Sequence, residues 1–408
     1  MRRSRAALAA GGLVAERTAP EASEHGPADD DRRMKDPVSI CNQLVLPALP
    51  GSTKFEVLLQ ATPYSASFVH HRMIEGEPRT CVTEVPHPEA SGPQIHVERA
   101  VYGGILWPNY GHFLAEGIHR LWPFWFGLVQ KDCPVAFHRT FPGAKRVPLP
   151  AYVGDILAFL GIPAANVMTI TRPTQFGELI IPRQGKLLGQ RASDEYNASF
   201  KSMPGGAVRF DRVYVSRSRY LATGSYLGEA LLESQLELAG FTIIHPEDWS
   251  LRDLVGIYRH ASAIIFSEGS PIHVMEVTGG TAAKVMIVNR RSSLFVQTNF
   301  VDSIAPLCKR VLAFQNQAAL TPLYWDARKE QPNLSLASAY VDLQALLSAI
   351  SGFFCIEVGQ LDPVALKTAI HADLVKVMFH ERVERHSDET IGRLFKMLKT
   401  QLEDLGLT

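Results

Sequence analysis

Residues 206–330 alternate between short apolar runs and longer segments in which apolar residues recur with the period of an α-helix. This alternation predicts a doubly wound parallel sheet, because strands buried on both faces read as continuous apolar runs. The predicted strands cover residues 212–216, 241–244, 264–267 and 284–289. The intervening helices are expected at 226–239, ending at Gly240, and at 250–261, where Ser250 and Asp253 occupy the positions of a capping box. The order strand–helix, repeated, is that of a doubly wound α/β domain.

Residues 37–205 show a less regular form of the same alternation, which predicts a first α/β domain. The expected strands cover residues 55–59, 67–71, 95–106, 135–137, 167–170 and 178–182, and a helix is expected at 152–160. The pair Gly103-Gly104 predicts a bulge in the third of these strands. The polar segment 184–206 ends in Pro204-Gly205-Gly206 and is interpreted as the connection between the domains.

A helix is predicted from His112 to Leu128, directly after the break at residues 107–111. At about 100° per residue its apolar and polar side chains separate onto opposite faces. The apolar face carries Leu114, Ile118, Leu121, Trp122 and Trp125, and the polar face carries His112, Glu116, His119 and Arg120. A solvated face with an ordinary i,i+4 pair is one interpretation. The edge of a binding cleft is the other, because His112 and Glu116 lie in the first turns after the break.

The stretch from Ile264 to His273 carries the most specific local pattern in the chain. A buried strand ends at Gly269, Ser270 offers an N-cap hydroxyl, and Pro271 suits the first helical position. A short helix is expected to reach Thr278 and to stop at Gly279-Gly280. A strand, a glycine turn and a helix N-terminus together form a cradle for an anion. The alternative is an ordinary βα turn that binds nothing.

The two ends of the chain differ from its middle. Residues 1–36 are rich in Pro, Glu and Asp beyond a weakly apolar start, and we expect a disordered tail. Residues 331–408 predict a C-terminal helical segment, with helices at 336–350 and 363–405. The last helix is charged and amphipathic, which fits packing across the domains or self-association as a homodimer.

Composition narrows the classes of partner. The 41 basic and 41 acidic residues cancel, so no global field favours nucleic acid or an anionic membrane, and an anionic ligand must be held locally. The five cysteines are scattered without a C-x-x-C pair, which indicates reduced thiols in a cytoplasmic protein and no zinc site. The sequence contains no run of 18 apolar residues, so no membrane-spanning helix is expected. Neither a G-x-G-x-x-G nor a P-loop pattern is present, which disfavours dinucleotide enzymes and P-loop NTPases.

Several segments resemble the family 61 glycosyltransferases. Residues 109–122, NYGHFLAEGIHRLW, are similar to that family's N-Y-x-H-F-L-x-[DE]-x-x-x-R-L segment, and residues 213–217, VYVSR, to its Y-[IV]-S-R strand. Residues 267–273, SEGSPIH, resemble the S-E-G-S-x-x-H turn of bacterial members, and the segment 247–261 resembles the family's P-E-x-[LW]-S-L…A helix. Each match is unspecific alone, but together they follow in order over residues 100–290.

The resemblance implies a GT-B architecture, in which two Rossmann-like domains face a cleft and the C-terminal domain holds a nucleotide-sugar. It further implies inverting sugar transfer, usually without a bound metal or other cofactor. We expect a UDP-sugar as donor and, as acceptor, a glycan or lipid-linked glycan of surface polysaccharide synthesis such as capsule. The location expected for such an enzyme is the cytoplasm, with peripheral contact to the inner membrane as an alternative.

The resemblance also assigns roles to residues. The Gly269-Ser270 turn would hold the donor diphosphate, and Arg217 would pair with phosphate. Ser267 and Glu268 are also expected to bind the nucleotide-sugar, and His273 would cap the turn or contact the donor. Glu276 would reach a ribose hydroxyl. His112 or Glu116 would deprotonate the acceptor, each orienting the other, and Arg120 would hold Glu116.

One position departs from the family pattern. Many members carry a second arginine several residues after the S-R pair, where this chain reads Ala222-Thr223-Gly224. Arg219 comes early and is the candidate substitute. A catalytically silent nucleotide-sugar or glycan-binding protein on the same fold is therefore a second hypothesis. A hydrolase using His112 and Glu116 is a third, although the chain has no G-x-S-x-G nucleophile elbow.

Overall fold

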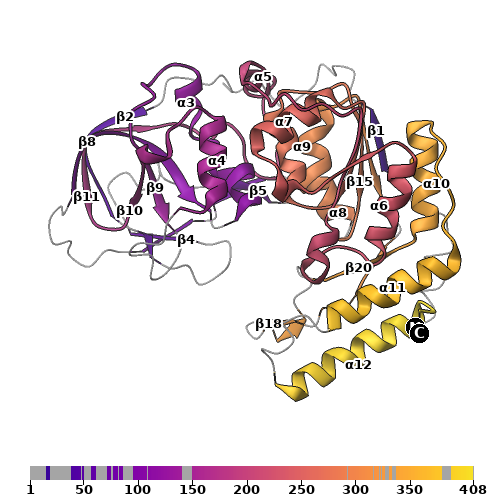
Figure 1. Ribbon diagram of the computed structural model, residues 1–408. Helices are drawn as coiled ribbons and strands as arrows, with labels where there is room; N and C mark the ends of the chain where they lie inside the picture. The colour runs from indigo at the N-terminus through magenta and orange to yellow at the C-terminus, as the bar shows by residue number, and fades with distance from the viewer. Residues whose placement is uncertain are drawn as a thin grey trace.

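The structure is a computed structural model of the 408-residue chain, and it shows two α/β domains beside each other with helices at the C-terminal end (Figure 1). The residues it describes are 15–18, 38–46, 48–49, 57–60, 71–74, 77–80, 82–85, 95–107, 109–139, 149–291, 293–315, 317–320, 322, 324–326, 330–332, 337–378 and 387–407. Both domains are built on a mainly parallel sheet, as the alternation of apolar runs and helices predicts, and the arrangement is consistent with GT-B.

The C-terminal domain contains a six-stranded sheet in the order β1-β16-β15-β14-β12-β13. Its strands are β12 (Arg212–Val215), β13 (Thr242–Ile244), β14 (Ala263–Ser267), β15 (Lys284–Val288), β16 (Arg310–Phe314) and β1 (Ala15–Thr18). All pairs among β12 to β16 are parallel, which confirms the doubly wound arrangement. β16 is an additional strand, in a region where the apolar pattern is weak.

Helices cover both faces of this sheet. They include α6 (Glu229–Leu238), α7 (Leu251–His260) and α10 (Leu343–Phe354). Alternate strand residues point to opposite faces, and Val213, Ile264 and Phe266 share one core with α7. Tyr214 and Ile265 share the other core with α6 and α10. The predicted cap of α7 is confirmed, because Ser250 Oγ accepts a hydrogen bond from the main-chain N–H of Asp253 at 3.1 Å.

The expectation of a disordered tail over residues 1–36 is wrong for residues 15–18. These residues form β1, which pairs antiparallel with β16. β16 would otherwise leave a row of unpaired main-chain groups at the sheet edge, and an added strand satisfies them. The other residues of the predicted tail lie outside the described part of the chain.

The N-terminal domain contains a five-stranded sheet in the order β10-β9-β8-β11-β2. Its strands are β2 (Val38–Val45), β8 (Ile95–Leu106), β9 (Val135–Arg139), β10 (Val167–Ile170) and β11 (Thr174–Ile181). β2 is antiparallel to its neighbour and the other pairs are parallel. The predicted bulge is confirmed by a register shift between Tyr102 and Gly104, and Gly104 has a φ of 87°. The predicted helix at 152–160 is α4 (Ala151–Phe159).

The single helix predicted from His112 to Leu128 is wrong. The chain forms α2 (Tyr110–His112), a π-helical turn η2 (Phe113–Gly117) and, after a break, α3 (Trp122–Trp125). The polar face is not solvated either, because Glu116, His119 and Arg120 are all less than 10% exposed. Gly117 lies against the ring of Phe113, with which any side chain at this position would collide. Pro123 lacks the N–H that a continuing helix needs, so one unbroken helix does not extend to Leu128.

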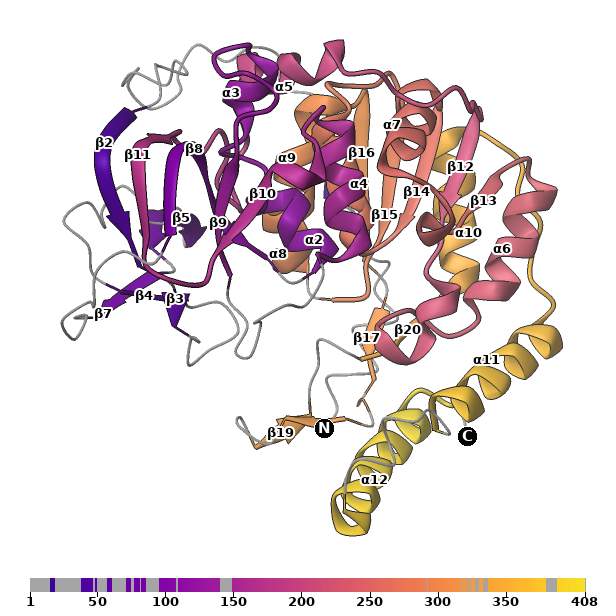
Figure 2. The ribbon, with the colours of Figure 1, turned by 60° about the vertical axis from the view of Figure 1, so that its left-hand side comes forward.

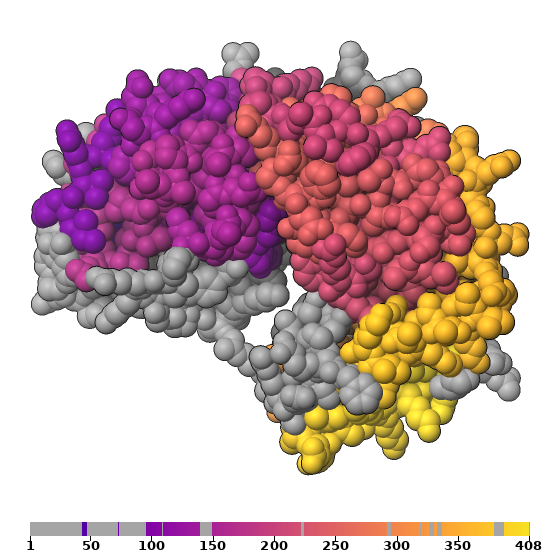
Figure 3. All heavy atoms as spheres, viewed as in Figure 1, coloured from indigo at the N-terminus to yellow at the C-terminus, as the bar shows by residue number. Residues whose placement is uncertain are grey.

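The segment 184–206 is more than a polar connection. It contains α5 (Asp194–Ser199) and the 3₁₀ turn η4 (Phe200–Ser202), and Arg259 of α7 donates hydrogen bonds of 2.6 Å to the carbonyls of Phe200 and Met203. Asp155 of α4 accepts a 2.7 Å hydrogen bond from the main-chain N–H of Leu251, which opens α7. The surfaces of the two domains accordingly meet along one continuous seam (Figure 3).

The helix predicted over 363–405 is two helices, α11 (Pro363–Met378) and α12 (Asp388–Asp404). They run side by side next to the C-terminal domain (Figure 1), and the turned view shows both below that domain (Figure 2). Ile370, Leu374, Leu394 and Leu398 are buried in one cluster with Leu227, so these helices pack on their own domain. Within the described residues, no helix combines the length and the apolar character needed to cross a membrane.

The described fold also contains shorter strands outside the two large sheets. They are β3 (Ala48–Leu49), β4 (Val57–Gln60), β5 (His71–Ile74), β6 (Glu77–Thr80), β7 (Val82–Val85), β17 (Gln317–Ala319), β18 (Trp325–Asp326), β19 (Gln331–Pro332) and β20 (Ala339–Val341). β4 matches the strand predicted at 55–59 in part. Of the strand predicted at 67–71, His71 opens β5 and the remainder lies outside the described residues.

Candidate active site

The turn after β14 carries two main-chain donors. Gly269 has an extended backbone (φ 175°, ψ −176°), and Ser270–Val277 forms the 3₁₀-helix η7. The expected Ser270 cap is wrong, because Gly269 is the N-cap residue and no side chain caps the helix. The short helix and its stop are confirmed by η7 and by positive φ values at Gly279 and Gly280. Among the described residues, no group accepts a hydrogen bond from the main-chain N–H of Gly269 or of Ser270.

A guanidinium lies directly against this turn. Arg217 follows β12, and a Cβ added at Gly269 would lie 2.5 Å from its Nη1 atom. The side chain is fixed by a 2.9 Å hydrogen bond from Nε to the carbonyl of Gly224. Burial lowers the pKa of Arg217, and the neighbouring Glu229 carboxylate opposes that effect. Arg217 and the Gly269 turn are thus brought together, as the sequence predicts.

Glu268 serves the neighbouring loop. Its carboxylate is buried and accepts hydrogen bonds from the main-chain N–H groups of Arg290, at 2.8 Å, and Arg291, at 2.9 Å. The Nε of Arg291 also donates to it. Ser267 is likewise buried at the end of β14. Ser267 and Glu268 are therefore buried residues that support the turn from within the domain.

Glu276 has internal partners in place of a ribose. His273 Nδ1 lies 2.9 Å from Glu276 Oε1, and the ammonium of Lys186 donates to the other oxygen of the same carboxylate. Burial alone would raise the pKa of Glu276, but Lys186 and His273 outweigh it and hold the pKa at about 2. The ribose contact expected for Glu276 stays a prediction, and both oxygens of this buried carboxylate already have partners within the protein.

The facing domain supplies an imidazole–carboxylate pair. His112 Nδ1 lies 2.5 Å from Glu116 Oε1, and Arg72 grips the same carboxylate from Nε at 2.5 Å and from Nη2 at 2.7 Å. A carboxylate held by a guanidinium acts as an acceptor, so Nδ1 of His112 donates to it and Nε2 carries the lone pair. The His112 side chain is 25% exposed, whereas that of Glu116 is fully buried.

The backbone places this pair next to the turn. Asn109 caps α2, since its Oδ1 accepts a 2.8 Å hydrogen bond from the main-chain N–H of His112. α2 packs on the start of η7, and a Cβ added at Gly111 would lie 2.5 Å from the hydroxyl oxygen of Ser270. A glycine at 111 is therefore needed for the two segments to approach so closely.

Two predicted arginine roles differ in the structure. Arg120 does not hold Glu116: its Nη1 donates to the carbonyl of Pro182, and its guanidinium lies 5.6 Å from the ring of Tyr102. Arg72 takes the expected place beside Glu116. Arg219 pairs with Asp248 at 2.9 Å on the surface, so it does not join Arg217 at the turn.

Sequence reasoning missed three residues of this region. Arg72 comes from β5, 44 positions before Glu116, and nothing in its local pattern marks it. Lys186 comes from the polar segment 184–206, and no sequence motif marks it as a partner of Glu276. Asn109 could have been found, because an Asn three residues before the N–H it accepts from is a common helix cap.

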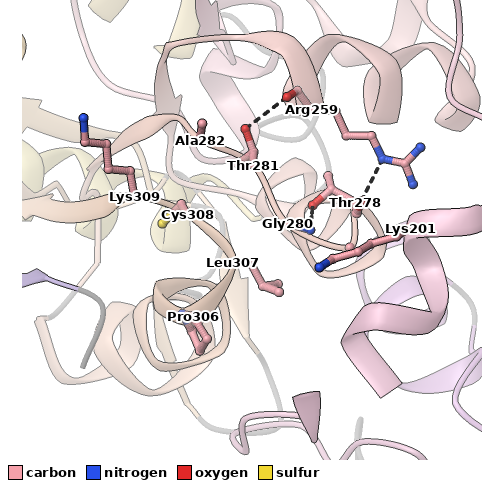
Figure 4. A pocket seen from close by; sticks show the side chains of 11 residues that line it. Lys201, Arg259, Thr278, Gly280, Thr281, Ala282, Pro306, Leu307, Cys308 and Lys309 are labelled. Atoms are coloured by element: carbon pink, nitrogen blue, oxygen red, sulfur yellow. Dashed lines mark hydrogen bonds between the residues drawn. The ribbon is translucent and has the colours of Figure 1, made fainter. Parts of the chain in front are cut away.

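A pocket of about 570 Å³ lies elsewhere in the C-terminal domain (Figure 4). Thr281 and Lys309, which line it, precede β15 and β16. The pocket therefore lies at the amino ends of these strands, while Gly269 and Arg217 lie beyond carboxyl ends. Arg259 in its wall is committed to three main-chain carbonyls. This pocket is not part of the site formed by α2 and η7.

Among the described residues, no group of three or more His, Cys, Asp or Glu side chains is placed to hold a metal ion. The comparisons with known proteins give a family match for the segment that contains the site. No curated protein matches the chain. The sequence model of the family described as Glycosyltransferase 61 matches residues 110–277, a span that begins at α2 and ends with η7. Through this segment the chain matches the glycosyltransferase 61 family, which is a family of sugar transferases.

Proposed function

We propose that this transferase moves a sugar, with inversion, from a nucleoside-diphosphate donor to a hydroxyl of a glycan or lipid-linked acceptor in surface polysaccharide synthesis. The supporting observation is the contact between α2 and η7. It sets the His112–Glu116 pair of one domain beside the Gly269–Ser270 turn and Arg217 of the other. A general base and an anion-binding turn are the two parts that this chemistry needs.

On the donor side, the main-chain N–H groups of Gly269 and Ser270 and the guanidinium of Arg217 would hold the diphosphate. They would compensate the negative charge that grows on the diphosphate as the bond to the sugar breaks. Both main-chain donors are fixed by the strand that precedes them, so no reorganisation is needed during the reaction. UDP is our choice of nucleotide.

On the acceptor side, Nε2 of His112 would take the proton of the acceptor hydroxyl while its oxygen bonds to the anomeric carbon. The bond from that carbon to the diphosphate oxygen breaks, and the nucleoside diphosphate leaves with the electron pair. Glu116 would stabilise the imidazolium that forms, and Arg72 would keep Glu116 ionised and oriented. Attack opposite the leaving group inverts the anomeric configuration.

Thermal stabilisation by a panel of nucleotides and UDP-sugars tests the donor assignment. UDP should raise the unfolding midpoint of the parent chain but not of Gly269→Val, whose side chain would collide with Arg217. Gly392→Val in α12 is the matched control, because a Cβ there meets no neighbour. Equal shifts in the parent and Gly269→Val would place the diphosphate elsewhere.

His112→Ala tests the base. We expect the rate of donor hydrolysis and transfer to fall by about a hundredfold or more, since this is the usual contribution of a general base. UDP should stabilise the variant as well as it stabilises the parent, because His112 is assigned no donor contact. A variant that keeps full transfer activity would contradict the proposed mechanism.

We extend the proposal to location, with the enzyme at the cytoplasmic face of the inner membrane. Cys133, Cys308 and Cys355 are unpaired thiols, which fits a reducing compartment. Phe126 and Leu128 are exposed apolar side chains next to α3 and suit a peripheral membrane contact. Cell fractionation tests this, and a Phe126→Ser/Leu128→Ser variant should move from the membrane to the soluble fraction.

A further inference from the structure

The position at which this chain departs from the family pattern holds a second guanidinium in the structure. The segment Ala222-Thr223-Gly224 contains no arginine, although the family resemblance implies one there. Gly224 has a φ of 106°, and its carbonyl accepts the hydrogen bond from Arg217 Nε. A Cβ added at Gly224 would lie 2.5 Å from Nη1 of Arg290 and 2.8 Å from its Cζ. Arg290 therefore fills the space beside the residue where the missing arginine is expected.

Arg290 comes from a different strand end. It follows β15, as Arg217 follows β12 and Gly269 follows β14. These three strands are neighbours in the sheet order β15-β14-β12. All three groups thus project from carboxyl ends of adjacent parallel strands, the edge at which ligands of such sheets bind.

One side of Arg290 is anchored and the other is not. Its main-chain N–H donates to a carboxylate oxygen of Glu268 at 2.8 Å, and its Nε donates to the main-chain carbonyl of Glu268 at 3.2 Å. The residue is 7% exposed, and Nη1 is buried without a hydrogen-bond partner among the described residues. A buried cationic donor without an acceptor is costly, and a bound anion would remove that cost.

The charge around Arg290 also favours an anion. Arg217, Arg290 and Arg291 gather near Glu268 and Glu229. Burial lowers the pKa of Arg290 to about 9, and Arg291 and Arg217 add to that decrease while the two carboxylates oppose it. Like charges held together in a buried position relax when an anion binds between them.

We propose that Arg290 is the second diphosphate-binding arginine of this chain, reaching the donor past Gly224 and replacing the arginine that residues 222–224 lack. The assignment rests on the nucleotide-sugar donor of the proposed function. Arg217 and Arg290 then approach the diphosphate from two strand ends on either side of β14. Arg219, the substitute suggested by sequence position, is instead paired with Asp248 on the surface.

The test separates phosphate binding from nucleoside binding. Dissociation constants of UDP and uridine are measured by titration calorimetry for the parent, Arg290→Gln and Arg219→Gln. In Arg290→Gln, the affinity ratio of UDP to uridine should fall about tenfold or more, the usual effect of losing one charge-assisted contact. In Arg219→Gln the ratio should stay within about twofold of the parent value, since this matched arginine does not face the turn.

The outcomes separate this inference from the proposed function. A parent chain that binds UDP more tightly than uridine, with the same ratio in Arg290→Gln, overturns the role of Arg290 alone. A parent that binds neither UDP nor inorganic pyrophosphate overturns both proposals. If Arg290→Gln does not fold by circular dichroism, Arg290→Lys keeps the charge but loses the planar fork. Its ratio should fall at least about threefold, and an unchanged ratio overturns the inference.

Discussion

At the scale of single residues, His112 is set by three contacts of different kinds. Asn109 fixes its main chain, Glu116 binds its Nδ1, and the ring of Trp107 lies 5.6 Å away at a tilt of 37°. The imidazole is thereby held in one orientation and one tautomer while a quarter of the side chain stays exposed. A base oriented in this way avoids the entropy cost of finding its geometry during each reaction.

Arg72 provides a prediction at this scale. Replacing it by Gln removes the guanidinium that orients the Glu116 carboxylate and, through that carboxylate, the imidazole of His112. The transfer rate should fall about tenfold or more, because a misplaced base loses part of its contribution. The measurement is kcat for the parent, Arg72→Gln and Arg99→Gln, a control in which Arg99 is half-exposed and pairs with Glu178. An unchanged kcat in Arg72→Gln would show that Arg72 does not act through His112.

At the scale of elements, η7 is held to the interdomain segment by a buried ion pair. Lys186 and Glu276 are both about 95% buried, and His273 completes the cluster. Such a pair adds little net stability compared with apolar residues of the same volume, but breaking it strands a buried charge. This cluster therefore fixes the position of the helix that follows the anion-binding turn.

Lys186→Met should consequently destabilise the protein strongly. We expect the free energy of unfolding to fall by about 3–5 kcal/mol, because Glu276 loses its cation while remaining buried. Urea denaturation measures the change. The matched control is Arg191→Met in the same segment, where an exposed pair with Asp194 is lost and a change of about 1 kcal/mol or less is expected. The double variant Lys186→Met/Glu276→Leu should regain most of the loss, and a double variant no more stable than Lys186→Met would refute the stranded-charge account.

The accuracy of the sequence predictions differs between kinds of element. Strands such as β10 and β14 were predictable because apolar runs bounded by turn residues depend on local sequence. The helix at 112–128 was not, because its polar side chains find partners far away, with Glu116 on Arg72 and His119 on Tyr196. A prediction from hydrophobic periodicity assumes that polar residues face solvent. That assumption fails where polar side chains form a buried network.

The site was predictable to a similar degree. The Gly269 turn and the His112–Glu116 pair lie in contiguous motifs, and their close approach through α2 and η7 agrees with the expected opposition of two domains. Arg290 and Arg72 were out of reach, because their roles arise from long-range packing with no local signature. Arg120 shows the opposite error: its i+4 spacing from Glu116 suggested a pair, while the backbone breaks after Gly117.

At the scale of the whole molecule, two buried histidines join distant parts of the N-terminal half. His119 Nε2 lies 2.8 Å from the carbonyl of Ala115, and its Nδ1 lies 2.7 Å from the hydroxyl of Tyr196 in the interdomain segment. His138 bridges the hydroxyl of Tyr102 and the carbonyl of Leu46 in the same way, at 2.9 Å each. In both, one nitrogen donates to a carbonyl and the other accepts from a tyrosine, which requires neutral imidazoles.

These histidines predict how stability depends on pH. Burial lowers the pKa of His119 from 6.5 to about 3 and that of His138 to about 4. The unfolded chain therefore binds more protons than the folded one below about pH 6.5, and stability falls as the pH falls through this window. Each histidine should cost about 1.4 kcal/mol per pH unit from about pH 6.5 to its folded pKa, and its contribution is fully present above pH 6.5.

Urea denaturation between pH 7.5 and pH 5 measures this slope, and variants assign it. His119→Gln should be less stable than the parent at neutral pH, because Tyr196 and Ala115 lose a fitted partner, but its stability should fall less steeply on acidification. His96→Gln, at an exposed position of β8, should reproduce the parent curve. The decisive quantity is the difference in slope between the parent and His119→Gln, about 1.4 kcal/mol per pH unit. Parallel curves would mean that acid destabilises this transferase through other groups, and that the seam between its domains does not depend on a neutral His119.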